Sequence, residues 1–232
     1  MCYALSCGNA EVRLMADFYS AEQRQLQDAF GTRGLADALH GNVLRQALAP
    51  MDRKFIAASD FFFLSTVDRC GYPTVSYKGG FPGFVQMPDD RTLRFPVYDG
   101  NGMFLSAGNI AGTSKVGLLF IDFTQPRRLR LQGTASLVTD EAQLADVPEA
   151  LMLVQVELEA IFTNCPRYIH SYHRTGRSEY VPADGAETPV PEWKRVDYLQ
   201  EQLPPKDREA ARKSGEVITE AEYRKHFWKG LE

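Results

Sequence analysis

The sequence is poor in cysteine and lacks the cysteine spacing of a metal or redox site. Its 232 residues include four cysteines, Cys2, Cys7, Cys70 and Cys165, and no two of them form a C-x-x-C pair. A chain of this length can bury a core large enough to fold without disulfide bonds. We therefore expect reduced thiols in a cytoplasmic protein, with Cys165 as a buried structural thiol.

Long apolar runs and an excess of positive charge are also missing. No apolar stretch approaches the ~18 residues that a transmembrane helix requires, and residues 1–13 show no basic segment followed by an apolar one, as a signal peptide would. The 26 Lys and Arg residues are outnumbered by 30 Asp and Glu residues, which gives a net charge of -4. Neutralising nucleic-acid phosphates requires a basic surface, so we expect neither a membrane nor a nucleic-acid partner.

The common catalytic and nucleotide-binding motifs are absent as well. The sequence contains no G-x-G-x-x-G, P-loop, G-x-S-x-G or H-E-x-x-H pattern. His170 and His173 have a spacing that can bind metal on a helix, but no Glu or Cys accompanies them at a suitable distance along the chain. We expect no metal site, and the sequence identifies no catalytic residue.

The apolar pattern changes from helical to strand-like along the chain. Residues 11–58 show helical spacing, interrupted at Gly31 and Gly34, and Pro50 is expected to close the helical segment. Period-two alternation and short apolar runs then predict seven strands, at 61–67, 74–78, 84–87, 93–97, 116–123, 129–137 and 152–162. Closing such a sheet into a barrel removes its exposed edges.

The chain is therefore expected to have three parts. These are an N-terminal helical segment (11–54), a β-barrel domain (55–163), and a loop and helix extension (164–232) packed on the barrel. The expected fold class is mainly β with flanking helices.

Two loop segments are candidates for binding an anion. In residues 76–83, glycines would let the backbone approach a ligand, and Lys78 could meet a phosphate. Residues 99–103 lead into a short helix expected over 103–111, whose N-terminus suits an anion. The first segment is equally well an irregular turn, and Asn101 is equally well a simple helix N-cap.

A third candidate is the basic run at the start of a predicted strand. Arg128 and Arg130 share one face of that strand because alternate residues point to the same side. The alternative is a solvated basic turn.

Three short stretches occur here in a characteristic order and spacing. They are Gly71–Val75 between two strands, Ser114–Phe120 after the short helix, and Arg128–Ala135 in the alternating strand. With these stretches, residues 55–162 resemble the pyridoxamine 5'-phosphate oxidase-like, FMN-binding split-barrel proteins. The resemblance implies a split β-barrel that works as a homodimer, with FMN at the subunit interface.

The resemblance also implies where FMN lies. The flavin would lie along one strand at 76–81 and the end of another at 95–97, the phosphate near residues 101–103, and Arg128 against the flavin. The candidate cofactor-binding residues are Ser76, Tyr77, Lys78, Gly79, Phe95, Pro96, Val97, Asn101, Met103, Asn109, Arg128, Arg167 and Trp193.

The sequence departs from this family at positions that bind phosphate and substrate. Ser76 stands where the family has an arginine, and Gly102 and Met103 stand where it has arginine and lysine. Arg167 and Trp193 are candidates to replace the family's substrate-binding arginine and tryptophan. We therefore expect a substrate other than pyridoxine phosphate.

Three functions remain open on the sequence. The resemblance favours an FMN-dependent oxidoreductase that acts on a small organic molecule. The alternatives are a flavin- or haem-binding module without turnover, in which His170 or His173 would ligate the haem, and a structural protein with an empty cleft.

Overall fold

The computed structural model describes residues 18–183 and 185–229. The chain divides into two compact units, Met1–Arg174 and Thr175–Glu232. Cys2, Cys7 and residues 11–17 of the predicted helical segment lie outside the described residues. Among the described helices, none combines the length and the apolar character needed to cross a bilayer.

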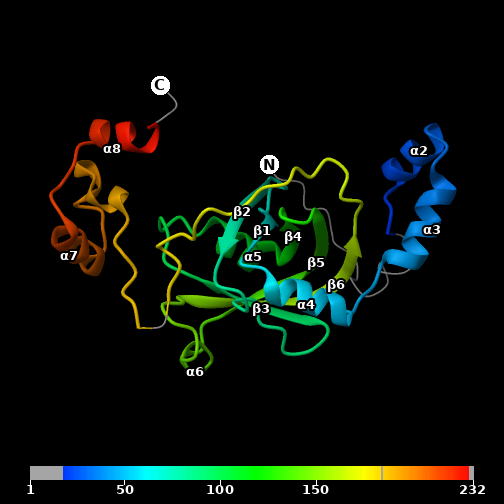
Figure 1. The fold of residues 1–232 in the computed structure, drawn as a ribbon, viewed down its shortest axis with the longest axis horizontal. Helices are drawn as coiled ribbons and strands as arrows, with labels where there is room; N and C mark the ends of the chain where they lie inside the picture. Colours follow the sequence, from blue (N-terminus) through cyan, green and yellow to red (C-terminus); the bar gives the residue numbers. More distant parts are fainter. Residues whose placement is uncertain (1–17, 184, 230–232) are drawn as a thin grey trace. The chain divides into compact units, whose positions relative to one another are not determined.

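The first unit is built on a six-stranded antiparallel sheet that curls into a half-barrel (Figure 1). The strand order is β2-β1-β4-β5-β6-β3. The strands are β1 (Phe61–Val67), β2 (Pro73–Gly79), β3 (Thr92–Val97), β4 (Lys115–Asp122), β5 (Arg127–Val138) and β6 (Met152–Thr163). β2 and β3 form the two edges of the sheet and do not pair with each other. This split barrel with flanking helices confirms the predicted fold class.

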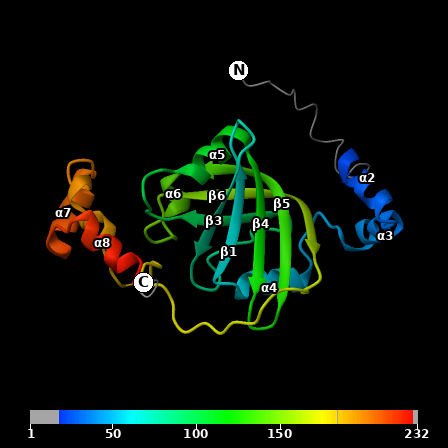
Figure 2. The same cartoon turned by 90° about the horizontal axis from the view of Figure 1, so that it is seen from above.

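The curl of the sheet is visible from above. Figure 2 shows β1, β4 and β5 side by side, with β6 and β3 crossing behind them at a steep angle. α5 (Leu105–Thr113) lies at one end of these strands and α4 (Pro50–Ala58) at the other. The short helix α6 (Glu141–Leu144) interrupts the connection from β5 to β6.

The concave side of the sheet holds the core, as the alternation of the strands predicts. In β1, Phe62, Leu64 and Thr66 are buried, and the intervening residues face the other side. The Phe62 ring packs edge-on against Phe95 at 4.9 Å and stacks against Phe120 at 5.0 Å. Full burial of one such side chain is worth about 1.5–3 kcal/mol, so this aromatic cluster contributes strongly to stability.

A β-bulge interrupts the pairing of β5 with β6: Gln132 pairs with Ala160 and Gly133 with Leu158, so Glu159 is an extra residue on β6. Here the two backbones come so close that a Cβ atom on Gly133 would lie 2.2 Å from the Glu157 carbonyl oxygen. Only glycine fits this position without a shift of the backbone. The bulge increases the local twist and so contributes to the curl of the sheet.

Two expectations about the first unit are wrong. Pro50 begins α4 instead of closing the helical segment. Proline is tolerated there because the N–H groups of the first turn form no hydrogen bond within the helix. Residues 84–87 form no strand, so the described residues contain six strands in place of the expected seven. Gln86 pairs with Arg94 only through an isolated bridge, with N–H···O distances of 2.8 and 2.9 Å.

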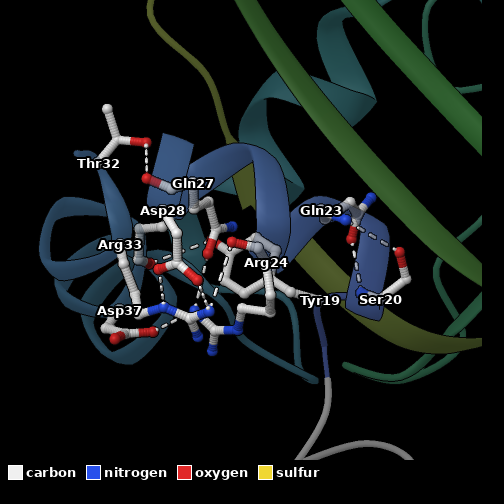
Figure 3. Close-up of polar contacts among 10 residues, drawn as sticks. Tyr19, Ser20, Gln23, Arg24, Gln27, Asp28, Thr32, Arg33 and Asp37 are labelled. Atoms are coloured by element: carbon white, nitrogen blue, oxygen red, sulfur yellow. Dashed lines mark hydrogen bonds and ion pairs between the residues drawn. The ribbon is translucent and has the colours of Figure 1, made fainter. Parts of the chain in front are cut away.

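Near the N-terminus of the described chain, polar contacts hold together α2 (Ala21–Ala29) and α3 (Arg33–Val43) (Figure 3). Arg24 pairs with Asp37 at 2.6 Å, and Arg33 binds both oxygens of Asp28 at 2.5 and 2.6 Å. The Tyr19 hydroxyl donates to the Ala36 carbonyl at 3.1 Å. Neither helix contains a buried residue.

The second unit contains η1 (Glu192–Arg195), η2 (Asp197–Leu199), α7 (Pro205–Ser214) and α8 (Glu220–Phe227). Its buried apolar residues are Val196, Leu203 and Ala211. The Lys194 ammonium is buried and lies 3.1 Å from the Asp207 carboxylate, so the buried charge is compensated.

Candidate functional site

A pocket of about 220 Å³ lies where the barrel is split. Its walls come from both edge strands, from the loop after β3, and from the first turn of α5. The lining residues are Leu64, Ser76, Lys78, Val97, Tyr98, Gly100, Asn101, Gly102, Met103, Phe104, Leu105, Ser106, Ala107, Ile110 and Val154. Five of the predicted cofactor-binding residues, Ser76, Lys78, Val97, Asn101 and Met103, therefore come together here.

Strand alternation directs Lys78 into this pocket. On β2, Ser76 and Lys78 line the pocket, whereas Val75 and Tyr77 are 70% and 60% exposed on the other face. Lys78 is partly buried, and its ammonium group makes no hydrogen bond or ion pair with any residue that the structure describes. Burial lowers the pKa of its ammonium group because it removes water from the charged form.

The first turn of α5 supplies a second anion-attracting group. Phe104, the residue before the helix, has a left-handed backbone (φ 49°), and no side chain caps this helix end. The N–H groups of a first turn have no partner within the helix and carry partial positive charge. Leu105, Ser106 and Ala107 belong to this turn and line the pocket, so these donors lie at its wall.

Hydroxyl groups connect the two walls. The Ser76 and Ser106 oxygens are 3.2 Å apart, within hydrogen-bond distance. Tyr98 adds a phenol whose pKa is raised, first by burial and then by the negative charge of Glu149. A raised pKa keeps this phenol protonated, and so able to donate a hydrogen bond, across the physiological range.

The loop between β3 and α5 is shaped by Asn101, but not as the helix cap considered above. The Asn101 side-chain oxygen accepts a hydrogen bond from the Met103 N–H at 3.1 Å, which closes a local turn. Gly102 within this turn has φ 75°, a conformation that favours glycine. Because α5 begins at Leu105 and not near Met103, Asn101 lies too far back to cap it.

Five other predicted residues flank the pocket without lining it. Tyr77 lies on the opposite face of β2, where its ring stacks on Phe61 at 5.3 Å. Gly79 ends β2, and Phe95 and Pro96 are buried in β3. The Asn109 amide donates to the hydroxyls of Thr66 and Thr74, at 3.0 and 3.4 Å, so its donors are directed into the fold.

The glycines after Lys78 have a packing role. Gly80 is buried, and a Cβ atom there would lie 2.3 Å from the Phe84 ring. Its N–H donates to the Asp60 carbonyl at 2.9 Å. The backbone at Gly80 therefore approaches an aromatic side chain of the same chain.

Three further candidates are not among the lining residues of the pocket. Arg128 is on the outer face of β5 opposite Ile121, and its Nε atom is buried without a hydrogen-bond partner among the described residues. Arg167 follows β6 and is exposed, and Trp193 belongs to the second unit.

The polar residues beyond β6 are accessible. His170 and His173 are exposed, and neither lines the pocket. Cys165 is also exposed, so the expectation that it is a buried structural thiol is wrong. In the described part of the chain, no three His, Cys, Asp or Glu side chains gather as metal ligands would.

The sequence profile of one protein family, described as pyridoxamine 5'-phosphate oxidase, matches residues 48–165. This match spans just over half of the chain and includes the whole sheet. The chain belongs to this family. No curated protein sequence matches the chain.

Several solved structures are similar to parts of this family member. HupZ from Group A Streptococcus is 17% identical over 54% of this chain and 100% of its own, with a TM-score of 0.42. HutZ, described as a haem storage protein from Vibrio cholerae, is 22% identical over 50% of this chain and 95% of its own, with a TM-score of 0.38. An FMN-binding protein from Syntrophomonas wolfei is 13% identical over 61% of this chain and 97% of its own, also with a TM-score of 0.38.

The sequence reasoning missed several pocket residues of this family member. Tyr98, Phe104 and Ser106 line the pocket but belong to no recognisable motif. For Ser106 the only available signal was its place in the first turn of a helix already suspected of binding an anion. Phe104 carries no signal, since its left-handed backbone is set by the surrounding fold.

Proposed function

We propose that the pocket at the split of the barrel binds FMN by its phosphate end. The observation that carries this proposal is the pairing of a partly buried, unpartnered Lys78 ammonium with the uncapped first turn of α5 in one pocket. A phosphate would accept charge-assisted hydrogen bonds from the lysine and further bonds from the backbone N–H groups. The Ser76 and Ser106 hydroxyls would complete the donor set.

The size of the pocket indicates that one subunit encloses only part of the FMN molecule. Pockets that enclose a complete small molecule measure about 300–1,000 Å³, whereas this one measures about 220 Å³. The pocket suits the phosphate and its neighbouring chain, and the flat ring system would extend beyond it. We propose that a second subunit covers that ring system, as in a homodimer with FMN at the interface.

The outer face of the sheet is a suitable surface for such a dimer. Tyr77, Phe61 and Phe123 form a row of nearly parallel rings, with centroid distances of 5.3 and 5.9 Å. Tyr77 in this row and Val75, also on β2, are largely exposed. Exposed apolar surface of this kind marks protein–protein interfaces.

We further propose oxidoreductase activity toward a small organic molecule. A bound flavin supplies the hydride or electron transfer itself. The chain's own residues would hold and orient the cofactor, and Lys78 and Tyr98 are the titratable side chains of the pocket lining. The role of Arg128 beside the flavin, and those of Arg167 and Trp193 toward substrate, stay predictions.

The absorption spectrum of freshly purified protein tests this function. A flavin spectrum that bleaches with a nicotinamide donor and recovers with oxygen would support an FMN-dependent oxidoreductase. A flavin spectrum without bleaching would leave a flavin-binding module. A haem Soret band, or a protein that takes up no added FMN, would contradict the proposal.

A further inference from the structure

Lys78 differs from every other lysine that the structure describes. Lys115, Lys194 and Lys213 each lie within 3.1 Å of a carboxylate oxygen. The remaining lysines other than Lys78 are exposed: Lys54, Lys206, Lys225 and Lys229. Lys78 alone in this set is partly buried without a carboxylate partner.

The surroundings of Lys78 make the neutral amine more accessible than it is for an exposed lysine. The pocket wall around it includes the apolar side chains of Leu64, Val97, Ile110 and Val154, and no acidic side chain lines the pocket. Such surroundings disfavour the ammonium form, and burial accordingly lowers the pKa of Lys78. A desolvated lysine with a lowered pKa is the type of lysine that attacks carbonyl groups.

The same pocket offers a place for a negative group at its other wall. The uncapped first turn of α5 and the Ser106 hydroxyl face the space that Lys78 enters. The helix has nine residues, enough for its N-terminal dipole to act. A volume of about 220 Å³ admits a molecule of a few carbon atoms that carries both a carbonyl and a phosphate.

We propose that, when the pocket holds no cofactor, the Lys78 amine captures small phosphorylated aldehydes as a reversible imine. The amine nitrogen bonds to the aldehyde carbon, the carbonyl oxygen leaves as water, and the two amine protons leave with it. No oxidant or reductant is needed. This step does not require that FMN occupies the pocket, and the two ligands would compete for it.

Reductive trapping with glyceraldehyde 3-phosphate tests the proposal on the full chain. Borohydride converts the imine to a stable secondary amine, which intact-mass and peptide-mass measurements locate. We expect one adduct per chain on the peptide that contains Lys78, formed about tenfold faster than with unphosphorylated glyceraldehyde because the anionic group is bound by charge-assisted contacts.

Two comparisons make the result specific. Lys78→Arg keeps the positive charge but cannot form the imine, so the adduct should vanish while the circular dichroism spectrum stays unchanged. Lys54 and Lys225 are exposed internal references on the same chain. Labelling spread over these lysines without preference for Lys78, or equal rates for the two aldehydes, would overturn the proposal.

Repeating the trapping after saturation with FMN separates this proposal from the function proposed above. Loss of the Lys78 adduct would support both. Trapping at Lys78 that FMN leaves undiminished would retain the aldehyde capture and remove Lys78 from the phosphate site. FMN binding without any trapping at Lys78 would refute the aldehyde capture alone.

Discussion

Lys78 and Asn109 were both predicted to bind the cofactor, but their side chains have different surroundings in the structure. Lys78 enters the pocket with no partner, so its charge is available to a ligand. Asn109 donates to Thr66, which is fully buried, and to Thr74. Only tertiary contacts reveal that Asn109, predicted to bind the cofactor, instead bonds the hydroxyl of the buried Thr66.

We expect Asn109→Ala to lower stability without weakening FMN binding directly. The change removes the donor to a buried hydroxyl network, which costs about 1–3 kcal/mol of the free energy of unfolding. Chemical denaturation of the cofactor-free protein measures this loss. Asn42→Ala is the control, because Asn42 is exposed on α3 and bonds only the Ala38 carbonyl of its own helix. A fall in FMN affinity with unchanged stability would place Asn109 in the cofactor site after all.

The lowered pKa of Lys78 predicts that FMN affinity depends on pH. Binding a phosphate favours the ammonium form, so the pKa of Lys78 is lowered in the free protein and rises in the complex. Between these two pKa values binding takes up a proton, and the affinity therefore falls as the pH rises above the pKa of Lys78 in the free protein. Titrations of FMN fluorescence at several pH values measure this dependence.

Lys78→Arg serves as the control for the pH titration. Arginine keeps its charge far into the alkaline range, so the affinity of this variant should be nearly constant over the same pH values. An equally steep fall in the variant would assign the pH dependence to another group.

At the scale of elements, strands with a regular alternation were predictable and their partners were not. The predicted strand at 61–67 coincides with β1, because it is a short run rich in aromatic and β-branched residues. The predicted hairpin of 84–87 with 93–97 failed, because β3 instead forms its ladder with β6, which lies far along the chain. Residues 84–87 contribute a single bridge to the other side of β3.

The pocket escaped prediction for a related reason. Ser76 and Lys78 come from one edge strand, whereas Tyr98 and Ser106 come from the segment after the other edge strand. No local pattern indicates that these edges face each other across the split. The family resemblance predicted that residues 76–78 and 101–103 lie near the cofactor. The curled sheet brings the other lining residues of the pocket to them.

The β5–β6 bulge leads to a prediction about stability. The Cβ atom that Gly133→Ala adds would lie only 2.2 Å from the Glu157 carbonyl oxygen, so the backbone must shift. We expect a loss of about 1–3 kcal/mol in the free energy of unfolding, as for other overpacked sites. Thermal and chemical denaturation measure it.

Gly108→Ala is the matched control for that experiment. Gly108 lies in α5, and a methyl group at this position would have no heavy atom within 4 Å outside the backbone of its own helix. Alanine favours helix over glycine by about 0.5–1 kcal/mol, so this variant should be at least as stable as the parent. Equal effects of the two substitutions would show that the bulge tolerates a side chain.

For the whole molecule, the proposed dimer covers the outer aromatic face of the sheet. Tyr77→Asp puts a charge at an exposed end of the aromatic row on that face and should convert the dimer to a monomer in sedimentation experiments, because burying an unpaired charge is costly. Tyr72→Asp is the control, since Tyr72 is 72% exposed but lies in the turn between β1 and β2. Dissociation by both changes, or by neither, would place the interface elsewhere.

The most direct test compares the affinities for FMN and for riboflavin, which lacks the phosphate, by quenching of flavin fluorescence. If Lys78 and the first turn of α5 hold the phosphate, the parent protein should bind FMN far more tightly than riboflavin. A charge-assisted contact is worth about 1.5–3 kcal/mol, so Lys78→Ala should weaken FMN binding about tenfold or more and leave riboflavin binding unchanged. Lys54→Ala, which removes an exposed lysine of α4, should change neither affinity. Equal affinities for the two flavins in the parent, or an unchanged preference for FMN in Lys78→Ala, would contradict the proposed phosphate site.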